Sequence, residues 1–356
     1  MSRPIIEGNA TIRISEESKI SKKLPVFYNP IMKFNRDISV LLLDAIPGKE
    51  ISIADPLAAS GIRSIRFLLE LKKGKIHNIL LNDIDPDFRR TLKENFQLNR
   101  LDLAKLEKKG IVEVMNTDAN LALLHSHCFD YIDIDPFGTP NPFLDSAVKR
   151  IAHEGILAVT ATDTSVLCGT YENACKRKYW AVPLHNELMH EIGLRILIRK
   201  VQLVGCQFEK ALIPIFSYSK DHYVRAFLQC RRGKKEADTV LKQHLTFTFD
   251  KKKAGPVWTG QLWDPTLVKK MVKRNTDVAV KKFLNIIEDE SKIPTVGFYD
   301  IHAQCKRNRI KDIPKTHLVM DRIRKAGYAV SRTHFSDLGI RSDMAGKDFI
   351  KLLKKT

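Results

Sequence analysis

The feature that most constrains the fold is a regular alternation of apolar and amphipathic segments through the first 230 residues or so. Apolar segments of five to seven residues, each followed by a helix-like stretch, lie at residues 51–55, 79–83, 111–115, 131–135 and 155–161. Two more strand candidates, 210–218 and 223–231, are joined by only four residues. Parallel strands need a long crossover, whereas a short turn joins antiparallel neighbours. The pattern therefore predicts an α/β fold, a doubly wound parallel sheet with an antiparallel edge strand.

The pattern changes near residue 233, where apolar periodicity lapses and charge rises. We expect residues 1–232 to form one domain with an N-terminal extension, and residues 233–356 to form a smaller α+β domain. From residue 300 to the end the sequence has fourteen Lys or Arg and six Asp or Glu. Such a local basic excess suits contacts with a phosphate backbone.

Composition narrows the class of protein. The formal net charge of +19 and a pI of about 9.6 favour a polyanionic partner, most simply nucleic acid, although a basic solubility surface is an alternative. The sequence has no apolar run of 18 residues, so no membrane span is predicted. The six cysteines include no Cys-x-x-Cys pair, which favours reduced thiols in the cytoplasm and gives no metal site.

The strand at 131–135 ends in Asp135-Pro136-Phe137-Gly138. Proline cannot continue the ladder, so the chain must leave the sheet there and present the Asp135 carboxylate at the carboxyl end of a strand. Ligands of open α/β sheets bind at that edge. A simple Asp-Pro turn is the alternative interpretation.

Three other positions suit a cofactor that carries a nucleoside. A small-residue turn with Gly61 follows the first strand, Asp83 ends the second and Asp118 follows the third. NAD and S-adenosylmethionine both fit this outline. A single glycine supports a pyrophosphate cradle poorly, and the Asp-Pro-Phe-Gly ending resembles that of amino-group methyltransferases. S-adenosylmethionine is therefore the favoured cofactor.

Further blocks match one known family in order along the chain. They include Glu7-Gly8, Phe27-Tyr28-Asn29-Pro30, Asn35-Arg36-Asp37, Ser60-Gly61-Ile62-Arg63, Asn82-Asp83-Ile84, Asp118-Ala119-Asn120, Asp135-Pro136-Phe137-Gly138-Thr139-Pro140 and Asp221-His222-Tyr223-Val224-Arg225. On these blocks the chain resembles the tRNA (guanine-26) N2,N2-dimethyltransferase family over nearly its whole length, and its length is similar to that of archaeal members. The resemblance implies a Rossmann-like class I S-adenosylmethionine-dependent methyltransferase fold.

The resemblance also implies roles for residues of the cofactor site. Arg36 and Arg66 would hold the cofactor through its methionine carboxylate or nearby backbone. Asp83 would accept hydrogen bonds from the ribose, and Asp118 with Ala119 would contact the adenine.

For the substrate, the resemblance implies that Asp135 hydrogen-bonds the guanine amine, either orienting it or accepting its proton, and that Phe27 and Phe137 stack on the base. The expected activity is transfer of one and then two methyl groups to N2 of guanine 26 in tRNA, by a monomer. The alternatives are methylation of another amine, such as adenine N6 or guanine N2 elsewhere in RNA, and a non-catalytic RNA-binding protein on a methyltransferase fold.

The chain departs from the family pattern at one place and has two basic segments that could contact RNA. Many family members carry paired cysteines after the last sheet strand, whereas this chain has only Cys230 there, so no zinc site is predicted. The segment 176–179 combines basic residues with an aromatic residue and favours RNA contact over a solvated face. The segment 332–335 could bind the tRNA backbone or stabilise the small domain.

Overall fold

A seven-stranded sheet lies at the centre of the protein. The computed structural model describes residues 2–15, 28–48 and 50–354. The strand order is β5-β4-β3-β6-β7-β9-β8. The strands are β3 (Ile51–Asp55), β4 (Ile76–Asn82), β5 (Val112–Met115), β6 (Phe129–Ile134), β7 (Ile151–Ala161), β8 (Lys210–Lys220) and β9 (Tyr223–Arg232).

The pairing confirms the predicted α/β fold class. Strands β5, β4, β3, β6 and β7 are mutually parallel, whereas β9 is antiparallel to both β7 and β8. One detail of the prediction is corrected, because the antiparallel strand is not the edge strand. The crossover through α9 (Met189–Cys206) places β8 parallel to β7 but one position further out, and the two-residue turn at 221–222 folds β9 back into the gap.

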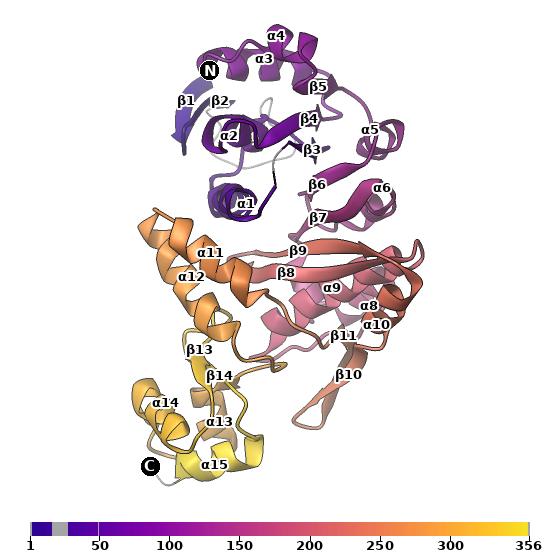
Figure 1. The fold of residues 1–356 in the computed structure, drawn as a ribbon. Coiled ribbons are helices and arrows are strands. Elements are labelled where there is room, and N and C mark those ends of the chain that lie inside the picture. The colour runs from indigo at the N-terminus through magenta and orange to yellow at the C-terminus, as the bar shows by residue number, and fades with distance from the viewer. Residues whose placement is uncertain (1, 16–27, 49, 355–356) are drawn as a thin grey trace.

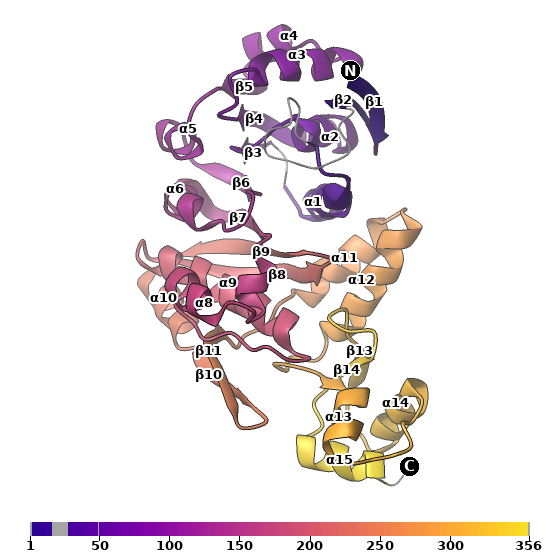
Figure 2. The same cartoon turned by 180° about the vertical axis from the view of Figure 1, so that it is seen from behind.

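Helices cover both faces of the sheet (Figures 1 and 2), so most side chains of its central strands β3 and β6 are buried on both sides. One layer contains α1 (Lys33–Ala45), α2 (Ile62–Glu70), α3 (Phe88–Leu98), α4 (Leu103–Lys108), α11 (Pro265–Arg274) and α12 (Val278–Glu290). The other layer contains α5 (Ala119–His125), α6 (Leu144–Arg150), α8 (Glu172–Tyr179), α9 and α10 (Lys234–Leu241). The short α7 (Thr164–Leu167) packs against α8 and α9.

The N-terminal residues form a hairpin of β1 (Ser2–Glu7) and β2 (Ala10–Ser15), which packs against α2 and α3. Two asparagine side chains, one in α3 and one just after it, accept hydrogen bonds from backbone N–H groups of β2. Thr11 N donates to Asn99 Oδ1 at 2.8 Å, and Arg13 N donates to Asn95 Oδ1 at 2.9 Å. The hairpin thereby brings Glu7 against α1 and α2.

The chain after β9 contributes to two hydrophobic cores. Residues up to Phe298, with the hairpin of β10 (His244–Phe249) and β11 (Lys252–Trp258), share the core of the sheet, and Phe335 joins them. Most other buried apolar residues between 301 and 353 build a second core. The division into 1–232 and 233–356 stays a prediction about folding units. The second core lies among β12 (Tyr299–Asp300), α13 (Ile301–Arg307), α14 (Thr316–Lys325), β13 (Val330–Arg332), β14 (Gly339–Ser342) and α15 (Gly346–Lys354).

A buried ionic network joins the C-terminal residues to α9 and α12. Arg341 Nη2 lies 2.7 Å from Glu191 Oε2, and its Nε lies 2.9 Å from Glu290 Oε1. His334 Nδ1 lies 2.7 Å from Glu290 Oε2, and Thr333 also hydrogen-bonds Glu290. The burial of Thr333 and His334 favours the stabilising role for the 332–335 segment. Arg341 is likewise buried, so it does not contribute to the basic surface of the C-terminal residues.

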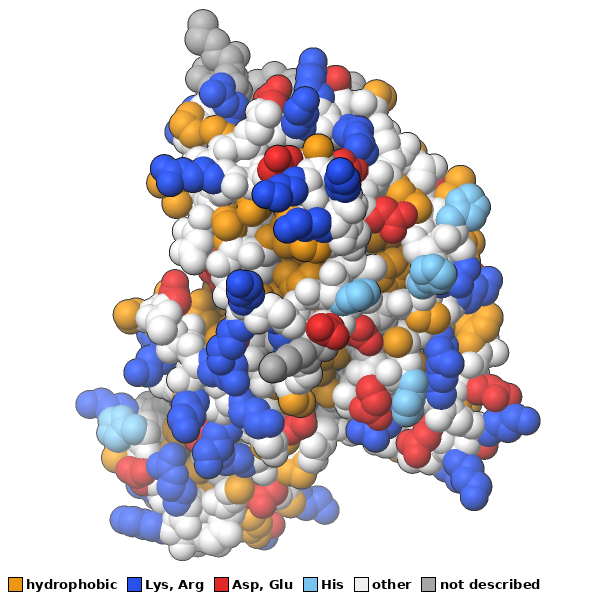
Figure 3. Space-filling model, turned by 45° about the horizontal axis from the view of Figure 1, so that its top comes forward, with side chains coloured by type: hydrophobic (Ala, Val, Ile, Leu, Met, Phe, Trp, Pro, Cys, Tyr) orange, Lys and Arg blue, Asp and Glu red, His pale blue; other side chains and the backbone are white. Residues whose placement is uncertain are grey.

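Basic side chains are numerous on the face shown in Figure 3, notably at its lower left, where the C-terminal residues lie. A hollow near the centre of this face is floored by hydrophobic side chains. Among the residues that the structure describes, no helix is both long and apolar enough to cross a membrane.

Candidate active site

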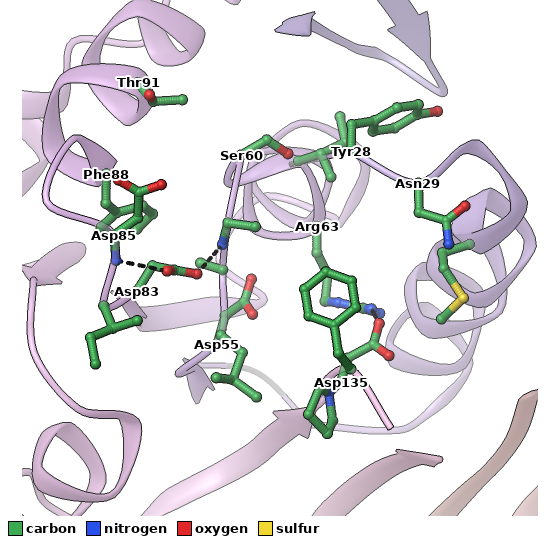
Figure 4. A pocket seen from close by; sticks show the side chains of 18 of the residues that line it. Tyr28, Asn29, Asp55, Ser60, Arg63, Asp83, Asp85, Phe88, Thr91 and Asp135 are labelled. Atoms are coloured by element: carbon green, nitrogen blue, oxygen red, sulfur yellow. Dashed lines mark hydrogen bonds and ion pairs between the residues drawn. The ribbon is translucent and has the colours of Figure 1, made fainter. Parts of the chain in front are cut away.

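A cavity of about 670 Å³ opens at the carboxyl ends of β3, β4 and β6. Its wall comes from the turn after β3, the segment after β4, the loop after β6 and the chain from Tyr28 to Arg36. Figure 4 shows Asp83 and Asp85 on one side, Arg63 and Asp135 on the other, and Asp55 between them. This volume is ordinary for a site that encloses a small-molecule cofactor and part of a substrate.

The turn after β3 depends on Gly61. This residue has φ +75°, a left-handed conformation, and immediately precedes α2. A Cβ at this position would lie 2.4 Å from Leu92 Cδ1. Only glycine therefore lets the backbone at 58–60 form the wall of the cavity with α3 packed behind it.

Asp83 is held in a fixed orientation at the end of β4. Its Oδ2 accepts a hydrogen bond from Ala59 N at 2.8 Å, and its Oδ1 accepts one from Asp85 N at 3.1 Å. A carboxylate has about four lone-pair sites, so two remain for ligand hydroxyl groups. The donor and acceptor set and the cavity volume fit a ribose-bearing cofactor.

The other acid predicted to contact the cofactor has a different environment. Asp118 Oδ1 caps α5 by accepting hydrogen bonds from Asn120 N at 2.9 Å and Leu121 N at 3.3 Å. Ala119 is buried, and neither it nor Asp118 is among the residues that line the cavity. Their role at the adenine stays a prediction.

Asp135 projects into the cavity beside a buried cation. Arg63 Nη2 forms an ion pair with Asp135 Oδ2, while Arg63 Nη1 lies 3.2 Å from Asp133 Oδ2. Asp133 is fully buried and also pairs with Arg225 Nη2 at 2.6 Å. Burial alone would raise the pKa of Asp133, but the charges of Arg225 and Arg63 lower it below its usual range. Two arginines and two aspartates thus compensate one another beneath the cavity.

The loop after β6 presents an exposed ring at the same place. Phe137 lines the cavity and is 45% exposed. Gly138 follows with φ +78°, and its N donates to Thr162 Oγ1 at 2.7 Å while its carbonyl accepts from Thr162 N at 2.9 Å. The end of β7 therefore fixes the loop. Phe27, the other predicted stacking ring, lies outside the described residues, although the adjacent Tyr28 lines the cavity.

Arg36 and Arg66 meet at one buried carboxylate. Glu7 Oε1 accepts hydrogen bonds from Arg36 Nε at 2.7 Å and from Arg66 Nη1 at 2.9 Å, and Glu7 Oε2 accepts one from Tyr28 OH at 2.8 Å. Burial would raise the pKa of Glu7, but the hydrogen bonds and charges of the two arginines lower it to about 2. Arg36 borders the cavity, whereas Arg66 is not among its lining residues and also pairs with Glu70.

Asp55 is a cavity residue to which the sequence analysis gave no role. It ends β3, lines the cavity, and accepts a hydrogen bond from Ser64 Oγ at 2.8 Å. Complete burial raises its pKa to about 7, although the charge of Arg63 opposes the rise. A signal was present, because Asp55-Pro56 repeats the strand ending of Asp135-Pro136.

The ion-pair partners of the predicted residues were also missed. Glu7, Arg63 and Arg225 are all in sequence blocks of the family resemblance, but a sequence pattern does not say which charges meet. Asp133 lies in a strand with period-two alternation, and this pattern does not predict that Arg63 and Arg225 pair with it. Within the described ranges, no group of three or more His, Cys, Asp or Glu side chains could hold a metal ion.

Comparison with known proteins places these features in a family. The chain matches the family model described as N2,N2-dimethylguanosine tRNA methyltransferase over residues 8–252 and 242–354. It is 39% identical to the tRNA (guanine(26)-N(2))-dimethyltransferase of Methanothermobacter thermautotrophicus, covering 95% of this chain and 94% of that one. It is 36% identical to the tRNA (guanine(26)-N(2)/guanine(27)-N(2))-dimethyltransferase of Aquifex aeolicus, covering 98% and 95%.

A solved structure gives the same result for the fold. Trm1 from Pyrococcus horikoshii, in complex with S-adenosyl-L-methionine, is 35% identical and superposes with a TM-score of 0.87. The match covers 98% of this chain and 99% of that chain.

Proposed function

The chain belongs to the N2,N2-dimethylguanosine tRNA methyltransferase family, and we propose that it transfers two methyl groups in succession to N2 of guanine 26 in tRNA. The methyl donor is S-adenosyl-L-methionine. The observation that carries the proposal is that one cavity holds both the oriented carboxylate of Asp83 and the Asp135 and Phe137 side chains of the Asp-Pro-Phe-Gly loop. A nucleoside cofactor and a nucleobase can therefore meet there.

When bound, the cofactor supplies a methyl group activated by a sulfonium. Asp83 accepts hydrogen bonds from the ribose hydroxyls with the lone pairs that Ala59 and Asp85 leave free. Arg36, which borders the cavity, faces the methionine end, while Arg66 holds Glu7 and so keeps Arg36 in place. Asp118 and Ala119 contact the adenine.

On the substrate side, Asp135 accepts a hydrogen bond from the exocyclic amine of a flipped guanine and so aims the nitrogen at the methyl group. Phe137 stacks on one face of the base and Phe27 on the other; a base gains roughly 1–3 kcal/mol from each such stack. The amine is a weak nucleophile because its lone pair is conjugated with the ring, so positioning matters more than prior deprotonation.

The ion pair with Arg63 bears on whether Asp135 acts as a base. Arg63 Nη2 engages Asp135 Oδ2, which fixes the orientation of the carboxylate and leaves Oδ1 to accept a hydrogen bond from the amine. We therefore assign to Asp135 the role of a hydrogen-bond acceptor that orients the amine, with the amine proton passing to solvent after methyl transfer.

The same contact accounts for two rounds of transfer. N2-methylguanine keeps one N–H on N2 and can still donate to Asp135. N2,N2-dimethylguanine has no N–H on N2 and loses that hydrogen bond, so it is bound less tightly than N2-methylguanine.

Methyl transfer from labelled cofactor to an unmodified tRNA transcript, followed by nucleoside analysis, tests the proposal. We expect N2-methylguanosine and then N2,N2-dimethylguanosine, and loss of both when guanine 26 is replaced by adenine. A transcript altered only at position 27 serves as the control, since the Aquifex relative is named for both positions. Recovery of methylated adenosine, or tight RNA binding without transfer, would contradict it.

A further inference from the structure

In the part of the chain that the structure describes, exposed aromatic side chains are rare and lie in two places. Among the aromatic residues that the structure describes, only Phe137, Tyr171 and Trp180 are exposed, at 45%, 60% and 52%. Phe137 belongs to the cavity. Tyr171 immediately precedes α8 and Trp180 immediately follows it. With the exposed Lys176 and Arg177 between them, these two residues form what we call the α8 surface.

Trp180 is held in place although half of it faces solvent. It has φ +55°, its N donates to Lys176 O at 3.1 Å, and its carbonyl accepts a hydrogen bond from Arg199 Nη1 at 3.2 Å. Lys200 Nζ lies 3.0 Å from the centre of the indole ring. A buried cation thus supports one face of the ring, and the exposed remainder is preorganised to receive a flat partner.

The α8 surface is tied to the active-site loop. Asn141 Nδ2 donates to Lys178 O at 2.8 Å. Tyr179 OH contacts Asp163 Oδ1 at 2.6 Å and Thr139 Oγ1 at 3.0 Å. Tyr179 is buried, so the side chains that the 176–179 segment offers to RNA are its three exposed basic ones, and their contact with RNA stays a prediction. The exposed aromatic residue is the neighbour of Tyr179, Trp180.

The charge of α8 favours an anionic partner. The last turn of α8 carries Lys176, Arg177 and Lys178, against one acidic residue, Glu172, in the first turn. Lys176 pairs with Glu172, and Lys178 lies 3.3 Å from Asp163 Oδ2. Arg177 has no ion-pair or hydrogen-bond partner within the described part of the chain.

We propose that the α8 surface binds the RNA strand beside the target guanine, with an unpaired base stacked on Trp180 and a backbone phosphate next to Arg177. The proposal rests on the function proposed above. Single-stranded RNA is recognised by aromatic platforms combined with cationic groups, and that combination is present here. The nucleotide on either side of a flipped guanine would be close to the α8 surface, because α8 and the Asp135–Asn141 loop are hydrogen-bonded.

Fluorescence gives a direct test. Of the three tryptophans, Trp258 and Trp263 are only 3% and 4% exposed, so Trp180 dominates acrylamide quenching in the full-length protein. Unmodified tRNA transcript should protect this fluorescence from acrylamide, and a Trp180→Phe variant should show no tRNA-dependent change. Unchanged quenching under conditions where a mobility shift shows bound tRNA would overturn the proposal.

Variants separate stacking from charge. Trp180→Ala should weaken tRNA binding roughly 5- to 150-fold, while Trp180→Phe should restore most of it. Arg177→Gln should reduce the slope of log affinity against log salt by about 0.7–1. Lys108→Glu, in the last turn of the distant α4, is the control and should change neither the affinity for tRNA nor its salt dependence. Cofactor affinity, measured by calorimetry, should stay unchanged throughout.

The outcomes distinguish the two proposals. If wild-type protein transfers no methyl group to tRNA, the function is wrong. If it does transfer methyl groups but the Trp180 and Arg177 variants bind tRNA as the wild type does, only the role of the α8 surface is wrong.

Discussion

Replacing Glu7 with glutamine tests how the N-terminal hairpin supports the cofactor side of the cavity. The Glu7 side chain is fully buried and pairs with both Arg36 and Arg66. Glu7→Gln keeps the volume and one acceptor oxygen but removes the charge that compensates two arginines. Both arginines would then be left partly unpaired, and Arg36 borders the cavity.

The lowered pKa of Glu7 sets the size of the stability loss expected for Glu7→Gln. Lowering it from 4.5 to about 2 corresponds to about 3 kcal/mol of folding free energy at neutral pH. Because the folded-state pKa is depressed, this stabilisation is present above pH 4.5 and is lost as the pH falls towards 2. The difference between wild type and Glu7→Gln should therefore shrink to about 1–2 kcal/mol near pH 3.

Urea unfolding of both proteins at pH 7 and near pH 3 measures the difference. Glu107→Gln is the matched control, since Glu107 pairs with the exposed Arg89 and should cost at most about 1 kcal/mol. Calorimetry should also show weaker cofactor binding by Glu7→Gln. A stability difference that is the same at both pH values, or below that of the control, would refute the role of the Glu7 network.

Two further substitutions test other parts of the site. Asp55 has a pKa raised to about 7, so its contribution is fully present below pH 3.8 and is lost as the pH rises through 7. The unfolding free energy of the wild type should fall by about 2–3 kcal/mol between pH 5 and pH 8, and Asp55→Asn should abolish that fall. Plots of unfolding free energy against pH that run parallel for the two proteins would contradict this. Tyr179→Phe should lower kcat by releasing the loop from Asp163 and Thr139, with cofactor affinity unchanged and a stability cost of about 1 kcal/mol; an unaltered kcat would exclude a positioning role.

Much of the sheet could be predicted because its strands obey simple rules. The buried parallel strands are mostly apolar, and β3 and β6 end at or just before Asp-Pro, where the ladder must stop. The four-residue link between the last two strand candidates identified them as antiparallel neighbours. Their order in the sheet was not predictable in the same way, because the path of the α9 crossover decides which of them is at the edge.

The candidate site was predictable in its acids but not in their partners. Asp83 and Asp135 follow from strand ends, which topology brings to one edge. The arginine that contacts Asp135 comes from α2, and Glu7 reaches Arg36 only because the hairpin packs on α2 and α3. Such pairings depend on tertiary packing, and periodicity carries no information about them. Tyr179 and Trp180 show the same limit, since adjacent residues have opposite exposure at the end of one helix.

The central claim is that Asp135 acts on the base and not on the cofactor. Single-turnover methyl transfer to unmodified tRNA by Asp135→Asn, with saturating cofactor, tests it most directly. Asp145→Asn, at an exposed pair with Lys149 on α6, is the control. We expect the Asp135→Asn rate to fall by about 10²-fold or more while cofactor affinity stays within a few-fold of wild type. A rate close to that of the control, or a large loss of cofactor binding, would contradict the account.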